Sequence, residues 1–278
     1  MLFRSFAEKT KGKSKRVIVN QPALQVVETH RKEAISEKNK GSNYMFWQTW
    51  RGFYFQSLEY MLQQDDVKTF KQINTVGHSL GTPVDDNILA WEVKQNMDAM
   101  NRIHSGVMTQ RIHTFDMHTH KYTYQDFKPK AEELILLGKF AITTLQSFIN
   151  LFPQANKPVM RSNIANPQSQ VGKSYVPAAT PYKHLNLAAM QEQVMHMTVI
   201  GDPNLEPGKT HTANVNRVIA TTSSNEAEPQ MSGRWLIAKT HHEIRRPNVR
   251  PRHVTNLECL KGRSEEHTSE LQSHSFIS

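Results

Sequence analysis

The sequence predicts an α+β protein that is mainly antiparallel β, with two lobes, the second of which is a C-terminal β-barrel or meander. Three observations support this fold class. Residues 44–57 form an aromatic run interrupted by Arg51-Gly52, residues 107–127 are rich in Thr and Tyr around Asp116, and residues 193–260 alternate short apolar segments with Gly, Pro and Asn. Aromatic and β-branched residues pack well on a pleated sheet, and Gly, Pro and Asn favour turns, so each region is typical of short strands joined by tight connections.

Length and composition bound the organisation of the chain. Its 278 residues, 37% of them hydrophobic, suffice for one large domain or two ordinary ones of roughly 100 to 200 residues each. We expect a first lobe over residues 1–127, a helical segment and connector over 128–185, and a barrel-like domain over 186–262. The sequence has no run of about 20 consecutive apolar residues and only one cysteine, Cys259, which we expect to be a small apolar residue of a strand. We therefore expect a soluble protein made in a reducing cytoplasm and without disulfides.

The first element is a helix. Residues 1–16 are basic and polar, with little periodicity. From Pro22 onward, Leu24, Val27, Ala34 and Ile35 fall near one helical face, and the polar run 37–42 ends the pattern.

An aromatic hairpin follows. Residues 44–50 and 53–57 are expected to be its strands, with Gly52 in the two-residue loop, and residues 58–64 to be a short helix capped by Ser57. Aromatic side chains alternate across both faces of this hairpin, so one face is expected in the core and the other at a subunit contact. The interface candidates are Trp47, Trp50, Phe53 and Phe55.

The middle of the chain has mixed patterns. Residues 87–103 are ambiguous between strand and helix, and Gly106 ends that segment as a turn residue. Residues 107–115 and 119–127 predict two antiparallel strands. Apolar residues at spacings of three and four predict a helix over 130–152, and residues 153–181, rich in Pro, Asn, Gln and Ser, are expected to be a connector.

The C-terminal part predicts strands at residues 193–200, 210–216, 233–243 and 253–260. The loop GDPNLEPGK and the polar loop 221–232 separate them. The predicted turn residues here are Gly201, Asp202, Gly208 and Gly233.

The last sixteen residues, 263–278, resemble the translation of a widely used sequencing adapter, so we expect a non-native tail and a natural protein that was cut off near Gly262. Without this tail the chain carries 33 basic and 22 acidic residues, a net charge of +11 against +9 for the whole chain. The basic residues are spread widely, which suits a solvated surface or an acidic partner as well as nucleic acid. A basic nucleic-acid-binding module therefore stays an alternative.

One catalytic motif competes with a structural role. The segment Gly77-His78-Ser79-Leu80-Gly81 matches the nucleophile elbow of lipases, in which a strained turn exposes the serine hydroxyl. A polar turn, Thr82-Pro83, follows it instead of a helix start, and the downstream chain predicts antiparallel strands instead of βαβ units. A serine esterase of α/β-hydrolase type is the alternative function, with Asp202 and His241 or His242 as partners of Ser79; the expectation is that the chain is not an enzyme.

The remaining motifs predict no cofactor and no metal. Gly172-Lys173-Ser174 resembles the end of a phosphate-binding loop, but Pro167 occupies the position that needs the first glycine. His118 and His120 would share one face of a strand, which is compatible with a metal, but no carboxylate or third histidine is placed to complete a site. The neighbours His241 and His242 would point to opposite faces.

Three segments together resemble the baseplate hub family of large contractile-tailed bacteriophages. They are YMFWQTWRGFYFQSLEYML, then NMDAMNRIHSGVMTQRIHTFDMHTHKYTYQDF, and finally GDPNLEPGKT with SGRWLIAKTHHEI. The order and spacing of these segments carry the resemblance, which spans most of residues 20–260. The family's opening strands are expected to be missing before Asn20.

The resemblance implies a structural virion protein. In that family the subunit forms a ring, a homotrimer, which joins the tail tube to the central spike and leaves a channel for the genome. The expected partners are therefore copies of the same chain, the tube and spike proteins, and DNA that passes without sequence-specific binding, with no membrane. The expected location is the tail baseplate of a virion assembled in the host cytoplasm.

Overall fold

The computed structural model describes residues 4–11, 18–38, 41–72, 85–95, 109–116, 120–127, 159–165, 176–191, 193–216, 228, 231–245 and 252–261. Several predicted features lie outside these residues: the motif at 77–81, the turn at Gly106, His118, the helix at 130–152, the segment 172–174 and the tail 263–278.

The described residues form an α+β fold that is mainly β, which confirms the predicted fold class. The helices are α1 (Ala23–Glu33), α2 (Leu58–Gln63) and α6 (Val176–Met190). The strands are β1 (Arg4–Ala7), β2 (Tyr44–Thr49), β3 (Gly52–Ser57), β4 (Asp66–Lys71), β5 (Ile88–Gln95), β6 (Gln110–Asp116), β7 (Lys121–Phe127), β8 (Val159–Ala165), β9 (Gln193–Ile200), β10 (Thr210–Asn214), β11 (Gly233–Arg245) and β12 (Arg252–Lys261). None of the helices within the described part of the chain is long and apolar enough to cross a membrane.

The strands are arranged in three sheets, and the chain divides into two compact units. The first unit holds two three-stranded sheets, β1-β3-β2 and β7-β6-β8, with α1 and α6. The second unit holds one six-stranded sheet in the order β4-β10-β11-β12-β9-β5. The chain passes from the first unit into the second within α2.

The predicted aromatic hairpin is confirmed in the first unit. Strands β2 and β3 pair antiparallel from Tyr44 opposite Ser57 to Thr49 opposite Gly52. Helix α2 follows directly, and the backbone amide of Tyr60 donates to Ser57 Oγ at 3.2 Å, so Ser57 is the predicted cap. Helix α1 begins one residue after Pro22, and Arg31 near its end donates to the carbonyl of Tyr44 at 3.0 Å.

Helix α6 is held to the hairpin region by polar contacts. Asn186 Nδ2 donates to Glu59 Oε1 at 2.8 Å, and Asn43 Nδ2 donates to the carbonyl of Lys183 at 3.2 Å. Burial raises the pKa of Glu59 and lowers the pKa of Lys183 to about 8, because both groups lose hydration when charged. Asn186 therefore gives the buried Glu59 a hydrogen-bond partner that water would otherwise supply.

The second sheet of the first unit contains the predicted Tyr-rich hairpin. Strands β6 and β7 pair antiparallel from Gln110 opposite Phe127 to Asp116 opposite Lys121, which confirms both strands. Strand β8 adds to β6 in parallel. The ring of Phe127 packs edge-on against Tyr182 of α6, with centroids 4.8 Å apart.

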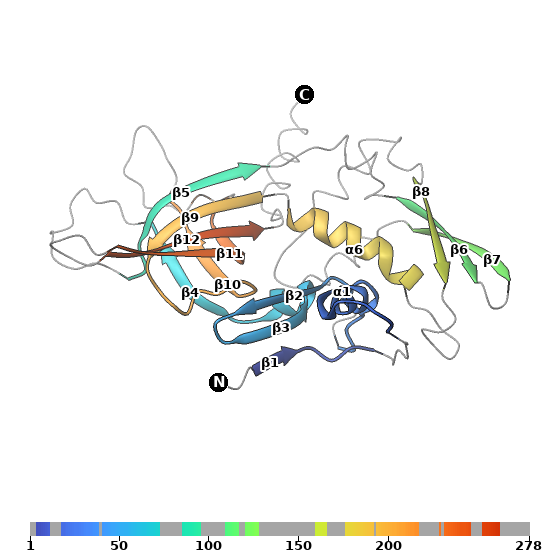
Figure 1. The fold of residues 1–278 in the computed structure, drawn as a ribbon. Helices are drawn as coiled ribbons and strands as arrows, with labels where there is room; N and C mark the ends of the chain where they lie inside the picture. The colour runs from blue at the N-terminus through green and yellow to red at the C-terminus, as the bar shows by residue number, and fades with distance from the viewer. Residues whose placement is uncertain are drawn as a thin grey trace, which may run out of the picture. The chain divides into compact units, whose positions relative to one another are not determined.

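The six-stranded sheet of the second unit is strongly curled (Figure 1). Strands β10, β11 and β12 form an antiparallel meander, and β9 and β5 continue the sheet antiparallel from β12. The four strands predicted after residue 190 are all confirmed. Alternate residues of β9, such as Met195 and Met197, point into an apolar core. The other buried members of that core are Phe70, Ile88, Val199, Leu205, Ala213, Val215, Trp235, Ile237, Leu257 and Cys259.

Several elements differ from the prediction. Strand β8 and the first turns of α6 lie within residues 153–181, which the composition predicted to be a connector. Pro181 lies inside α6, although proline normally interrupts helices, so the prolines of this region were misleading signals. Strand β1 lies within the segment expected to lack regular structure and pairs in parallel with β3. Strand β4 was not predicted, and the ambiguous segment after residue 87 forms β5.

Candidate functional site

Aromatic rings form a continuous stack across one face of the sheet β1-β3-β2. Phe6, Tyr54 and Trp47 are neighbours in register on the three strands. The Phe6 and Tyr54 centroids are 4.8 Å apart and those of Trp47 and Tyr54 are 5.1 Å apart, both with nearly parallel planes. Such stacked pairs contribute roughly 0.5 to 1.5 kcal/mol beyond their area burial. The stack therefore holds the short strand β1 on the hairpin.

On the opposite face of the hairpin, Tyr44 anchors the end where β2 begins and β3 ends. Tyr44 is fully buried, its ring lies 4.9 Å from that of Phe55, and its hydroxyl donates to the carbonyl of Lys9 at 3.2 Å. Burial, with the charge of Glu8 as a smaller cause, raises the pKa of Tyr44. Phe46 stacks on Phe53 at 5.9 Å nearer the tip.

The four predicted interface residues of the hairpin are in different environments. Trp47, Phe53 and Phe55 are half-buried and stack within the sheet. Trp50, in the turn, is 70% exposed, and the Arg51 guanidinium lies 4.9 Å from its ring centroid. An exposed tryptophan with a cation over its ring presents a large contact surface at the tip of the hairpin.

A second aromatic surface lies on the sheet β7-β6-β8. Phe115, Tyr122 and Tyr124 share one face in register and are 41%, 57% and 63% exposed. Arg111 lies 5.2 Å above the ring of Tyr124 and makes a two-bond ion pair with Asp126 at 2.6 and 2.8 Å. We call these five residues the β6–β7 aromatic face. Sequence reasoning predicted the strands but did not single out this face, although the alternation of Tyr122 and Tyr124 is its signal.

Strand β7 also presents a free edge within the described residues, because it is the terminal strand of its sheet. All its side chains before Phe127 are exposed, on both faces of the strand. A terminal strand carries a row of unpaired backbone amides and carbonyls that accept a further strand. The aromatic face and this edge together form a candidate contact surface of the first unit.

Most predicted turn residues lie at the ends of strands. Gly52 and Gly233 begin β3 and β11 with φ of 153° and 120°, and Gly208 has φ of 85° before β10. A Cβ on Gly52 would lie 2.1 Å from the carbonyl oxygen of Arg4, so β1 approaches the hairpin closely at this point. The carboxylate of Asp202 accepts from the amide of Asn204 at 2.9 Å, which closes the turn after β9.

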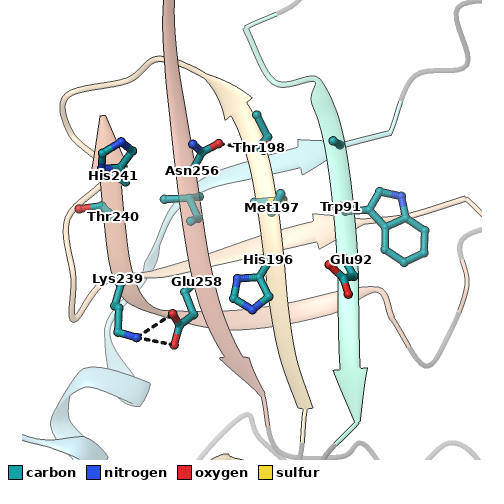
Figure 2. Close-up of a pocket in the computed structure, with 12 residues that line it drawn as sticks. Trp91, Glu92, His196, Met197, Thr198, Lys239, Thr240, His241, Asn256 and Glu258 are labelled. Carbon is teal, nitrogen blue, oxygen red and sulfur yellow. Dashed lines mark hydrogen bonds and ion pairs between the residues drawn. The ribbon is translucent and has the colours of Figure 1, made fainter. Parts of the chain in front are cut away.

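An open groove of about 630 Å³ lies on the six-stranded sheet of the second unit. Figure 2 shows its polar residues in rows across the strands β11, β12, β9 and β5. In one row Lys239 pairs with Glu258 at 2.8 Å, and His196 follows in register between Glu258 and Glu92. In the next row, Thr198 Oγ1 donates to Asn256 Oδ1 at 2.9 Å. The groove therefore combines charged and polar side chains with apolar ones, such as Trp91 and Met197.

Within the described part of the chain, no hydrogen bond joins the side chains of Asp202, His241 and His242, the residues considered for an esterase site. His241 lies in the groove opposite Asn256, whereas His242 lies opposite Thr255 on the other face of β11, as their spacing predicted. The carboxylate of Asp202 lies 3.9 Å from Lys68 Nζ, and His242 contacts Thr255 and His253. Ser79 is outside the described residues.

The described residues contain no group of three or more His, Cys, Asp or Glu side chains placed to hold a metal. In the Tyr-rich hairpin, His113 Nδ1 is hydrogen-bonded to the hydroxyl of Tyr122. Cys259 is a buried residue of β12, as predicted, and burial raises the pKa of its thiol.

Comparisons with solved structures find several matching chains. No model of a known protein family matches the chain, and no curated protein matches it in sequence. The 43 kDa tail protein of prophage MuSo2 from Shewanella oneidensis aligns with 93% of this chain at a TM-score of 0.43 and 7% sequence identity. The chain covers 59% of that protein. A TM-score and an identity this low assign neither a family nor a function to the chain.

Proposed function

We propose that this chain is a structural subunit of a phage tail, and in particular the baseplate hub that joins the tail tube to the central spike. The proposal starts from the order of the three segments that resemble the hub family. Those segments form β2, β3 and α2, then β6 and β7, and finally the strands β10 and β11 with the loop before β10. In this role the chain acts by assembly in the virion, and no side chain is assigned a catalytic function.

The observation that carries the assembly function is the β6–β7 aromatic face. Tyrosine, phenylalanine and arginine are enriched where protein surfaces bury each other, and lysine and glutamate are depleted there. Here Tyr122 and Tyr124 are more than half exposed beside a strand edge that no other described strand pairs with. Burying these rings against another subunit removes apolar surface from water, and pairing the free edge satisfies its backbone groups. The partner that we propose is another copy of the same chain, in a homotrimeric ring.

Sedimentation velocity of the full chain tests this assembly. We expect a species of three times the 31.9 kDa chain mass that dissociates on dilution. The double variant Tyr122→Ser, Tyr124→Ser is expected to raise the dissociation constant roughly 100-fold or more, because buried interface tyrosines contribute about 2 kcal/mol or more each.

The matched control is Gln125→Ala on the same strand, whose side chain points to the other face. It is expected to leave the dissociation constant within about threefold of the wild-type value, an effect of less than 1 kcal/mol. A wild-type chain that stays monomeric at every concentration, or a control that dissociates as readily as the double variant, contradicts the proposed assembly.

The location in the tail needs a separate experiment. Particles of the phage that encodes this chain would be purified, their tails isolated, and the tail proteins identified by mass spectrometry. We expect peptides of this chain in the tail fraction and antibody labelling at the baseplate end. Their absence from purified tails contradicts the tail function, whereas labelling along the tube contradicts only the assignment to the hub.

The net positive charge fits a subunit around a channel for the genome without sequence-specific contacts. Any affinity of the chain for DNA is expected to be independent of sequence and to fall steeply with salt, because it arises from phosphate contacts. Competition between DNA fragments of equal length and unrelated sequence measures this. A preference for one sequence that persists at high salt favours the nucleic-acid-binding alternative.

A further inference from the structure

Two imidazoles meet on neighbouring strands of the second unit, away from the surfaces described above. His242 of β11 lies opposite Thr255, and His253 of β12 lies opposite Ile244, so the two histidines are diagonal neighbours on one face of an antiparallel pair. His242 Nδ1 is 3.3 Å from His253 Nε2, and the ring centroids are 5.5 Å apart. Thr255 Oγ1 lies 3.0 Å from the same His242 nitrogen.

The backbone around this pair holds both rings in place. The β11–β12 register runs without a shift from Lys239 opposite Glu258 to Arg245 opposite Arg252, which sets the diagonal of the two histidines. His253 lies against Gly201, where a Cβ would be 2.0 Å from the imidazole Cγ, and the amide of Gly201 donates to the carbonyl of His253 at 3.0 Å. The amide of Asp202 donates to Thr255 Oγ1 at 3.3 Å. Both rings are also reachable, since His242 is exposed and His253 is half-buried.

The spacing of the two ring nitrogens suits a metal ion. Zinc binds imidazole nitrogen at about 2.0 to 2.1 Å with tetrahedral angles, which places two such nitrogens about 3.3 Å apart. Neutral imidazole is also a preferred ligand of nickel and copper(II). We propose that His242 Nδ1 and His253 Nε2 form a binding site for a divalent transition-metal ion of this imidazole-preferring class.

The proposed site is open. Besides the two imidazoles, the described residues supply no further ligand from a carboxylate, an imidazole or a thiolate in a metal-binding cluster. Water therefore completes the coordination shell. An open shell with two protein ligands binds an exchangeable ion, in contrast to the closed shell of a structural zinc site. This inference goes beyond the proposed tail function and does not depend on it.

Isothermal titration of the full chain with zinc chloride, and separately with nickel chloride, tests the site at neutral pH. The chain has 14 histidines, so weak binding elsewhere forms a common background. We expect one site per chain above this background. His242→Ala and His253→Ala are each expected to weaken the affinity of this site for the metal ion more than about tenfold. Even residues that only orient a metal ligand contribute about this much to metal affinity.

The matched control is His241→Ala, which removes the adjacent imidazole from the opposite face of β11. Circular dichroism spectra of all variants establish that they fold. If the control loses the ion as readily as His242→Ala, or if both ligand variants bind like the wild type, the site does not exist. Gly201→Ala supplies a second readout, because its added Cβ displaces the His253 ring without removing a ligand, and it is expected to weaken binding as well.

Discussion

At the scale of single residues, His211 is a titratable group buried in the core of the second unit. Its imidazole is fully buried, packs edge-on against Phe70 at 5.5 Å, and lies 3.9 Å from the Cys259 thiol. Burial lowers the pKa of His211 to about 4, and the charge of Asp66 opposes this shift only in part. A histidine has an ordinary pKa near 6.5 in an unfolded chain. The unfolded state therefore binds a proton on this residue at a higher pH than the folded state.

This difference predicts an acid-dependent stability. As pH falls below about 6.5, His211 protonates first in the unfolded chain, so the free energy of unfolding decreases until the pH falls below the folded pKa of about 4. Between pH 7.5 and pH 5 the His211 contribution falls by about 2 kcal/mol.

Urea unfolding of the wild type and of His211→Gln at both pH values measures this contribution. The variant is expected to be less stable at pH 7.5 but to lose about 2 kcal/mol less than the wild type on acidification. Equal losses in the two proteins would show that His211 does not titrate in this window.

At the scale of the elements, strand β4 is held to the edge of the six-stranded sheet by a polar cluster. It pairs in parallel with β10, and the register shifts between Thr210 and Thr212. Thr212 Oγ1 donates to one oxygen of Asp66 at 2.6 Å, and Arg234 Nε of β11 donates to the other at 2.6 Å. Burial raises the pKa of Asp66, but the hydrogen bonds from threonine and the charge of Arg234 outweigh it and leave the pKa below its ordinary value. The carboxylate thus joins β4, β10 and β11.

Asp66→Asn is expected to lower the free energy of unfolding by about 2 kcal/mol, because it removes the charge of the carboxylate that pairs with the largely buried Arg234 at 2.6 Å. The matched control is Glu258→Gln, which breaks the exposed ion pair with Lys239 on the same sheet and is expected to change stability by less than about 0.5 kcal/mol. Chemical denaturation at pH 7 compares the two. A loss from Asp66→Asn no larger than that of the control would show that the cluster is dispensable.

At the scale of the whole molecule, the sheets of the described residues differ from the parallel, helix-flanked sheet of an α/β-hydrolase. Among the described strands, the parallel pairs are β1 with β3, β4 with β10, and β6 with β8. Each three-stranded sheet therefore has one parallel and one antiparallel pair, whereas the other four strand pairs of the six-stranded sheet are antiparallel. A nucleophile elbow requires a strand that leads through a strained turn into a helix. In the sequence, the motif with Ser79 comes after β4, which is a terminal strand of the second unit's sheet, and the motif itself lies outside the described residues.

The expectation that the chain is not an enzyme is tested on the complete protein. We expect its rate of p-nitrophenyl butyrate hydrolysis at pH 7.5 to equal that of Ser79→Ala, because no general base is assigned to Ser79. Initial-rate measurements on both proteins, purified in parallel, provide the comparison. A rate that is lost in Ser79→Ala and in either His241→Ala or His242→Ala would establish the esterase alternative.

The elements predicted from the sequence are those whose signals are local. The hairpin of β2 and β3 follows from alternating rings and a glycine in the loop, and the cap of α2 follows from a serine before an apolar run. The misread elements depended on distant partners. Strand β8 pairs with β6, and α6 is held by Glu59 and Asn43, so packing outweighed the proline-rich composition of that region.

The candidate sites, too, depend in part on local residue types and in part on which strands pair. The interface candidates of the hairpin follow from their aromatic character, but which rings stay exposed depends on β1, whose Phe6 stacks on Tyr54. The β6–β7 aromatic face needs the register of two strands to bring Phe115 beside Tyr122. The histidine pair needs the register of β11 and β12 together with the close approach of Gly201.

The sequence by itself determined the fold class, most strands after residue 190 and the aromatic hairpin, because the spacing of apolar residues and the chemistry of turn residues act over a few positions. Only the tertiary structure decided that β4 and β5, from the first hundred residues, complete the sheet of β9 to β12. Only it decided that His211 is buried beside Cys259. Such pairings depend on which apolar faces can bury each other once the strands exist, and that choice is a property of the whole core.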